Sequence, residues 1–111
     1  MIFVTGPMFS GKKAALLSLL HWTEQDFAQR AVQQVEALVE DGSTPEELLK
    51  KLAHYEVLIA SEVGGGVVPM DPRQRAHREA AGRLAILLAR EADTVIRVFC
   101  GIPTILKGTL P

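Results

Sequence analysis

Residues 1–20 read MIFVTGPMFSGKKAALLSLL, and the rest of the chain is organised around this stretch. It begins with a short β-branched and aromatic run, Ile2 to Val4, which is long enough for a buried strand and too short for a helix. The residues from Ala14 to Leu20 are strong helix formers. The stretch therefore predicts a strand, a glycine-bracketed loop and a helix.

The loop between this strand and this helix nearly matches a phosphate-binding loop, which needs Gly, four residues, Gly, Lys and then Ser or Thr. The first seven positions fit, and the eighth, Lys13, does not. Two glycines can turn N–H groups toward a phosphate, the helix N-terminus adds positive potential, and the lysine supplies a charge. The candidate phosphate-binding residues are Gly6, Pro7, Met8, Phe9, Ser10, Gly11, Lys12 and Lys13.

Lys13 stands where the motif normally offers a hydroxyl to Mg²⁺, and an ammonium has no lone pair to donate. A role for Mg²⁺ is therefore doubtful. From the residues alone, two interpretations of this corner stay open. One is a phosphate-binding loop, and the other is an ordinary strand-turn-helix corner that happens to contain two glycines.

Composition narrows the class of protein. The 111 residues suffice for a single domain, residues 1–111, and 48% of them are hydrophobic without a run near the ~20 residues of a membrane span. A net charge of -1 argues against a general nucleic-acid or membrane-surface binder. We find no signal peptide pattern, and a single cysteine, Cys100, excludes an internal disulfide. We therefore expect a cytoplasmic protein in which Cys100 is a buried, inert thiol.

Two helices are predicted in the middle of the chain. The first spans residues 23–41 and ends at Asp41-Gly42-Ser43. The second begins at Thr44-Pro45 with Glu47 in the capping position and runs to about Ala53. The apolar stripe of the first helix consists of Phe27, Ala31, Val35, Leu38 and Val39.

Two further strands and a long helix complete the prediction. Val57 to Ala60 forms a buried strand, and residues 94–99 form another, which Arg97 interrupts. A helix over residues 72–91 directs Ala80, Leu84, Leu87 and Leu88 to the core. The pattern indicates an α/β fold with a mainly parallel three-stranded sheet flanked by helices. The carboxyl ends of its strands would bring residues 5–13, 61–66 and 100–103 to one site.

The loop Glu62-Val63-Gly64-Gly65-Gly66-Val67-Val68-Pro69 resembles the Asn-Glu-Val-Gly-x-Gly-Ile-Val-Pro signature of the adenosylcobinamide kinase/adenosylcobinamide-phosphate guanylyltransferase family. The opening Phe3-Val4-Thr5-Gly6 and Ser10-Gly11-Lys12 are similar to that family's phosphate loop. The helix after the signature is matched by Arg75, Arg78, Ala81, Gly82 and Arg83. Together the matched blocks span well over half of the chain.

The resemblance implies a small P-loop-type three-layer fold. It also implies an enzyme that uses GTP or ATP to phosphorylate a side-chain hydroxyl of a corrinoid. It also implies a homo-oligomer. Lys12 would contact the nucleotide phosphates. Glu62 would orient Mg²⁺-bound water or a substrate hydroxyl, or equally form a salt bridge to Arg75 or Arg78. The two arginines would clamp phosphate, and Gly64, Gly65 and Gly66 would let the backbone approach a ligand closely.

The family's central region, which carries the histidine that becomes guanylylated, has no counterpart here. Residues 23–55 replace it, and none of the three histidines lies in the guanylylation motif. We therefore expect the guanylyltransferase half to be lost, and no spacing suggests a metal site. Two alternatives stay open: a non-catalytic nucleotide- or anion-binding module with a regulatory or assembly role, and a structural protein that binds no nucleotide.

Overall fold

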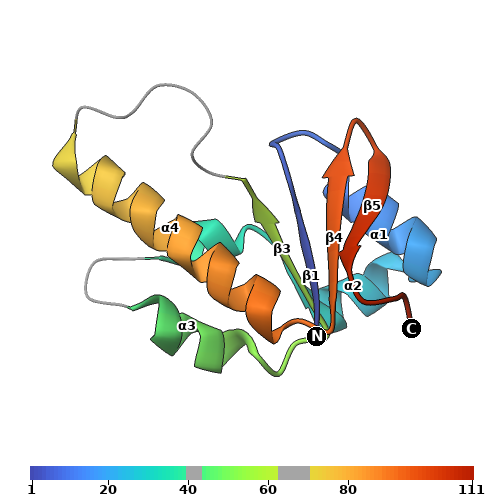
Figure 1. Cartoon of the computed structure of the whole chain (residues 1–111). Helices are drawn as coiled ribbons and strands as arrows, with labels where there is room; N and C mark the ends of the chain where they lie inside the picture. Colours follow the sequence, from blue (N-terminus) through green and yellow to red (C-terminus); the bar gives the residue numbers. More distant parts are fainter. Residues whose placement is uncertain (40–43, 63–70) are drawn as a thin grey trace.

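A computed structural model of the chain describes residues 1–39, 44–62 and 71–111. Its centre is a five-stranded sheet with the order β2-β3-β1-β4-β5, and helices cover both faces (Figure 1). The elements are β1 (Ile2–Gly6), α1 (Lys12–Leu20), α2 (Glu24–Arg30), β2 (Ala31–Val32), the 3₁₀ helix η1 (Val35–Leu38), α3 (Pro45–Leu52), β3 (Val57–Ser61), α4 (Pro72–Glu91), β4 (Thr94–Phe99) and β5 (Ile102–Lys107).

The predicted strand β1 lies in the middle of the sheet, where it pairs in parallel with both β3 and β4. Two apolar clusters fill the spaces on either side. One packs η1, α3 and α4 against the sheet, and the other packs α1 and α2 against the opposite face. The predicted α/β class and mainly parallel sheet are confirmed. The sheet has five strands where the sequence predicts three, and the two additional strands are the outer ones, β2 and β5.

The strand β5 returns antiparallel to β4 through a two-residue turn. The turn residues, Cys100 and Gly101, have φ angles of 50° and 74°, which suit a tight hairpin turn. The sequence predicts only a turn here, and five of the six residues of β5 are exposed, so no half-buried alternation marks the strand. The prediction of a buried Cys100 is wrong: the thiol is exposed because it lies in the turn beyond the strand end.

The prediction of a single helix over residues 23–41 is also wrong. The helix α2 ends at Arg30, and the next two residues are extended and pair with β3 as the short strand β2. Phe27 and Ala31 are buried with α1, whereas Val35 and Val39 are buried with α4 on the other face of the sheet. One continuous helix cannot pack against both faces of the sheet, so the helix ends at the sheet edge and the chain crosses to the other face. The predicted stop at residues 41–43 lies outside the described residues.

The predictions for α3 and α4 are confirmed. Thr44 accepts a hydrogen bond from the N–H of Glu47, whose carboxylate accepts one from the N–H of Thr44. The helix α4 spans Pro72–Glu91 as predicted and is capped by Asp71. Leu84 and Leu88 are buried as expected. Ala80 and Leu87 are only partly buried, and Ala81 takes a place in the core instead.

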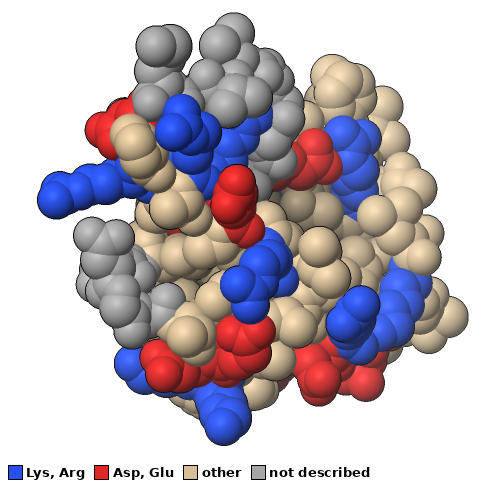
Figure 2. Space-filling model, turned by 60° about the vertical axis from the view of Figure 1, so that its left-hand side comes forward, with Lys and Arg blue, Asp and Glu red and all other residues tan. Residues whose placement is uncertain are grey.

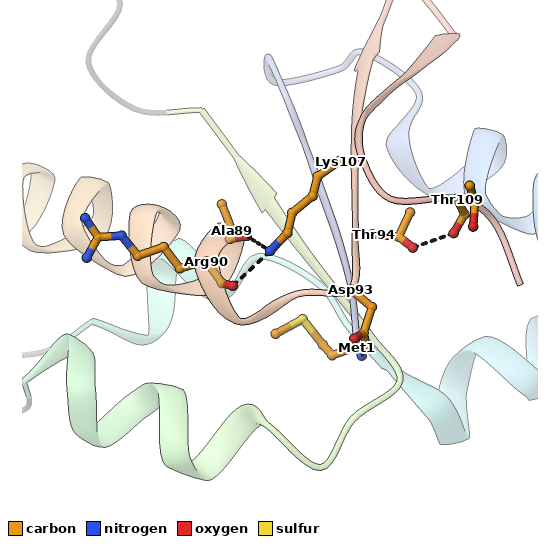
Figure 3. A network of polar contacts seen from close by, with 7 residues as sticks. All are labelled: Met1, Ala89, Arg90, Asp93, Thr94, Lys107 and Thr109. Carbon is orange, nitrogen blue, oxygen red and sulfur yellow. Dashed lines mark hydrogen bonds and ion pairs between the residues drawn. The ribbon is translucent and has the colours of Figure 1, made fainter.

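Polar contacts close the sheet at the amino ends of β1 and β4 (Figure 3). The α-amino group of Met1 lies 2.6 Å from a carboxylate oxygen of Asp93. Lys107 donates hydrogen bonds to the carbonyl oxygens of Ala89 and Arg90, two acceptors at the end of α4. These contacts tie the start of β1 and the ends of α4 and β5 together.

The charged surface is mixed. On the face seen in Figure 2, basic and acidic side chains are interspersed, without one large patch of a single sign. Within the described part of the chain, none of the helices is long and apolar enough to cross a membrane.

Candidate functional site

The glycine-bracketed loop joins β1 to α1 at the carboxyl edge of the sheet (Figure 1). Gly6, Phe9 and Gly11 have φ angles of 155°, 58° and 81°. The carbonyl oxygen of Ser10 accepts a hydrogen bond from the N–H of Gly101 at 2.8 Å, so the β4–β5 turn supports the loop. The N–H of Glu62 likewise donates to the carbonyl of Gly6 at 2.9 Å. The three segments that the sequence assigns to one site therefore meet, as far as they are described.

Lys12, the first residue of α1, folds back over the loop. Its ammonium donates to the carbonyl oxygens of Pro7 at 2.8 Å and Gly6 at 3.3 Å. Burial lowers the pKa of Lys12, while the nearby carboxylates of Glu36 and Glu62 act in the opposite direction. The lysine is thus a half-buried cation held at the loop. A bound phosphate would replace the two carbonyl oxygens as the hydrogen-bond acceptor of its ammonium group.

Lys13 has a different environment. Its ammonium lies 2.8 Å from a carboxylate oxygen of Glu24 and 4.7 Å from the centre of the Phe27 ring. Both partners belong to α2, so contacts with that neighbouring helix hold the charge of Lys13. The residue that departs from the motif therefore pairs with a helix instead of occupying the phosphate position.

A cavity of about 550 Å³ opens in front of the loop, a volume typical of small-molecule sites. Six of the eight candidate loop residues line it, and the facing wall comes from the β2–η1 region, β3 and α4. The lining residues are Met8, Phe9, Ser10, Gly11, Lys12, Lys13, Ala14, Gln33, Gln34, Glu36, Ala37, Ile59, Ser61 and His77. Gly6 and Pro7 contribute through the carbonyl oxygens that hold Lys12.

Glu36 is a cavity residue that the sequence does not single out. It lies in η1, and one carboxylate oxygen accepts a hydrogen bond from the N–H of Ser61 at 3.1 Å. Its other oxygen, Oε2, is buried and has no hydrogen-bond partner among the residues that the structure describes. The helical pattern expected for residues 23–41 placed this glutamate on an ordinary helix. A missed strand, β2, is what brings it to the site.

Glu62 lies just beyond β3, and its carboxylate is paired with Arg97 of β4. Nε and Nη2 of the arginine donate to the two carboxylate oxygens at 2.6 and 3.1 Å. The pairing with Arg97 lowers the pKa of Glu62, and the charge of Lys12 adds to the effect. The sequence predicts Arg75 or Arg78 as a salt-bridge partner of Glu62, whereas the structure shows a pairing with Arg97.

The Glu62–Arg97 pair predicts a pH-dependent contribution to stability. Because folding lowers the pKa of Glu62 from its ordinary value near 4.5, the contribution is complete above that pH and is lost as the pH falls through the folded-state pKa. Glu62→Gln should therefore unfold at lower urea concentration than wild type at pH 7, and the difference should shrink below about pH 4.5. A difference that stays constant down to about pH 3 would show that the pair does not act this way.

The remaining predicted site residues are placed as follows. Arg75 and Arg78 lie in the first half of α4, and neither is among the described residues that line the 550 Å³ cavity. His77, from the same part of α4, does line it. Gly64, Gly65 and Gly66 lie outside the described residues, so their predicted role stays a prediction.

Two residues of the predicted site, Lys13 and Glu62, offer no free oxygen to Mg²⁺. Lys13 offers no lone pair, and both oxygens of Glu62 are engaged by Arg97. Within residues 1–39, 44–62 and 71–111, no group of three His, Cys, Asp or Glu side chains is arranged to hold a metal ion. Position 13 therefore lacks the hydroxyl that usually binds the magnesium ion of a P-loop.

The strand, the glycine-bracketed loop, the lysine at the helix start and the parallel sheet define a nucleotide-binding protein of the P-loop type. A family model described as cobinamide kinase / cobinamide phosphate guanyltransferase matches residues 13–106, most of the 111-residue chain. The chain therefore belongs to this family, as the resemblance predicted. Membership implies a cobinamide kinase/guanyltransferase role in cobalamin biosynthesis, with nucleotide and corrinoid substrates.

The matched region begins at Lys13, so residues 6–12 of the loop precede it. Their assignment depends on the sequence motif and on the loop geometry. A search of curated proteins found no significant match to the chain.

Proposed function

We propose that this protein is a P-loop kinase of a single truncated domain, residues 1–111, that acts in the cytoplasm. It binds the phosphates of GTP or ATP on residues 6–13 and transfers the γ-phosphoryl group to a side-chain hydroxyl of a corrinoid. The observation that carries the proposal is the position of Lys12, which is held at the loop and lines a 550 Å³ cavity at the carboxyl edge of the sheet.

The chemistry would consist mainly of positioning and electrostatic stabilisation. The loop amides and the N-terminus of α1 would hold the phosphates, and Lys12 would exchange its two carbonyl partners for phosphate oxygens. Glu62, which Arg97 fixes in place, would keep a negative charge beside Lys12 and so favour its protonated form. Gly64, Gly65, Gly66, Arg75 and Arg78 would take part in substrate or phosphate binding.

The test is transfer of the labelled γ-phosphoryl group of GTP or ATP to cobinamide, with wild type beside Lys12→Ala. We expect transfer by wild type and none by the variant. Both proteins should be assayed with and without Mg²⁺, because Lys13 replaces the usual hydroxyl ligand. Equal transfer by the two proteins would assign the activity to something other than this loop, and no transfer by either would refute the kinase.

We propose further that the guanylyltransferase activity is lost. This part depends on the absence of a matched histidine in the sequence. Incubation with labelled GTP, acid-labile trapping and mass spectrometry would detect a guanylylated histidine. Such an adduct would contradict this part of the proposal and leave the kinase part intact.

A second candidate is a non-catalytic nucleotide- or anion-binding module with a regulatory or assembly role. Lys13 favours it, because residue 13 is where a P-loop normally offers a hydroxyl to its metal ion, and the Lys13 side chain is instead paired with Glu24 of α2. Thermal shift with GTP, ATP and sulfate separates the two candidates. Stabilisation that needs Mg²⁺ supports the kinase, whereas stabilisation indifferent to Mg²⁺ supports the module.

The proposal includes self-association, which the family resemblance implies. Apolar side chains are exposed along the outer hairpin, among them Phe99, Ile102, Ile105 and Leu106. The strand β5 is also a sheet edge, which can pair with another chain. Light scattering of purified protein should give more than the 12.1 kDa of one chain, and a single-chain mass would contradict self-association.

A further inference from the structure

The peptide group between Ser10 and Gly11 is tied to the turn that joins β4 and β5. The N–H of Gly101 donates to the carbonyl oxygen of Ser10 at 2.8 Å. Two glycines also meet here, since a Cβ atom added to Gly11 would lie 3.5 Å from the Cα atom of Gly101, an ordinary van der Waals distance. The phosphate loop and the turn are therefore in direct contact through their backbones.

The turn and the facing wall of the 550 Å³ cavity lie on opposite sides of β1. In the sheet, β1 stands between β3 and β4, and the phosphate loop follows β1 (Figure 1). The wall that faces the loop comes from the β2–η1 region, β3 and α4. Among the described residues, none from β4, β5 or their turn lines the cavity. The carbonyl of Ser10 is thus directed away from the side on which the cavity lies.

The direction of this carbonyl fixes the direction of the next N–H. The described part of the chain contains no cis peptide bond, and in a planar trans peptide group the C=O and N–H bonds point in opposite directions. The N–H of Gly11 is therefore directed away from the turn, to the side of the cavity that Gly11 lines. Within the described residues, this N–H donates to no acceptor of the protein. It has the direction that an anion-binding loop requires of its amides.

The turn holds the Gly101 donor in a defined conformation. Cys100 and Gly101 have φ angles of 50° and 74°, both positive as in a type I′ turn, and Phe99 pairs with Ile102 on either side. Glycine adopts a positive φ freely, whereas cysteine rarely does so. A residue persists in this region where its surroundings determine it, and such residues cluster at functional sites.

We propose that Gly101 is a positioning residue of the phosphate loop. Its N–H fixes the carbonyl of Ser10 and thereby aims the N–H of Gly11 at the phosphate that the loop binds. This inference rests on the proposed binding of phosphate by residues 6–13. Without the contact, the peptide group between Ser10 and Gly11 is free to rotate, which turns a carbonyl oxygen toward the anion in a fraction of the molecules. Affinity falls accordingly, because only the aligned loop is competent to bind.

The contact acts on the phosphate chain of the ligand. It orients an amide of the loop and touches neither the nucleoside nor the phosphoryl acceptor. The loss of the contact should therefore weaken the binding of inorganic triphosphate and of GTP by the same factor. This equality distinguishes positioning of the loop from an effect of the turn on the nucleobase.

The N–H of Gly101 can be removed alone by chemical ligation, because the preceding residue, Cys100, is the single cysteine of the chain. Residues 1–99, labelled with ¹⁵N, are joined as a thioester to a synthetic peptide of residues 100–111 in which glycolic acid replaces Gly101. An ester oxygen then takes the place of the N–H, and ligation of the all-amide peptide gives the control. We expect the ester protein to bind inorganic triphosphate and GTP about three- to tenfold more weakly by calorimetry. The amide signal of Gly11 should shift in the ligand-free protein.

Gly108→Ala in the same synthetic peptide separates positioning from a general loss of stability. A Cβ atom at Gly108 would collide with the carbonyl oxygen of Asp93, at the other end of β5 from the turn. We expect this variant to unfold at lower urea concentration than the all-amide protein and yet to bind inorganic triphosphate within about twofold of it, since the two sites are far apart.

Unchanged affinity in the ester protein would overturn the inference and leave phosphate binding by the loop intact. An equal loss of affinity in Gly108→Ala would also overturn it, because the contact would then act through stability alone. A loss for GTP that inorganic triphosphate does not share would assign the turn to the nucleoside instead. If the all-amide protein binds neither ligand, the proposed function fails, and Gly101 has no phosphate to position.

Discussion

Gly6→Ala is expected to lower the free energy of unfolding by about 3 kcal/mol or more. Gly6 has a φ of 155°, and a Cβ atom there would lie 2.2 Å from the carbonyl oxygen of Val98. That oxygen belongs to the backbone of β4, the neighbour of β1, so it cannot move without disturbing the sheet. Urea unfolding followed by circular dichroism measures the effect.

Gly101→Ala is the matched control, because its φ of 74° is also positive and a Cβ atom there would have no neighbour within 4 Å. It should cost only about 1–2 kcal/mol, the penalty of the left-handed backbone. Equal losses in the two variants would show that backbone conformation alone, and not the close approach of β1 and β4, requires glycine at position 6.

Lys12→Ala is expected to weaken GTP or ATP binding by about 10- to 100-fold, whereas Lys13→Ala should change it by less than about threefold. A hydrogen bond to a charged group contributes about 1.5–3 kcal/mol, and each 1.4 kcal/mol is a factor of about ten. Lys12 is held at the loop by Gly6 and Pro7, but the charge of Lys13 is engaged by Glu24 and Phe27. Isothermal titration calorimetry of the two variants provides the comparison.

Lys13→Ser adds a second measurement in the same series. It restores the hydroxyl that a P-loop normally offers to Mg²⁺, so nucleotide binding should become more dependent on Mg²⁺ than in wild type.

Equal losses of affinity in Lys12→Ala and Lys13→Ala would contradict the different environments of the two lysines. The phosphate would then be held by general positive charge at the start of α1.

Local signals in the sequence were sufficient for the central elements. The run from Ile2 to Val4, the two loop glycines and the caps at Thr44 and Asp71 each predict one local structure, and each is found. These signals depend on neighbouring residues alone, so tertiary packing did not override them.

The outer strands could not be predicted in the same way. The strand β2 has only two residues, and its apolar neighbours fit a helical period although they pack on opposite faces of the sheet. The exposure of β5 removes the alternation that marks a half-buried strand. Both strands exist because of pairing with residues outside their own segment, which a local pattern does not contain.

The residues of the candidate site likewise fall into those that a local sequence pattern predicts and those that only the tertiary structure brings together. The phosphate loop is contiguous, so its spacing alone is enough to predict Lys12 and the two glycines as phosphate-binding residues. Glu36 reaches the cavity only because α2 ends at Arg30 and the chain passes the edge of the sheet, and nothing in its neighbourhood signals this. The pairing of Glu62 with Arg97 likewise joins residues 35 positions apart.

The most direct measurement of the central claim is titration of ¹⁵N-labelled protein with GTP or ATP, followed through the backbone amide signals. The account predicts that the amides of residues 6–13 shift most, together with those of Glu36 and Ser61 at the cavity wall, and that Lys12→Ala suppresses the shifts. Signals of the loop that remain unchanged at saturating nucleotide, or shifts confined to another surface, would contradict it.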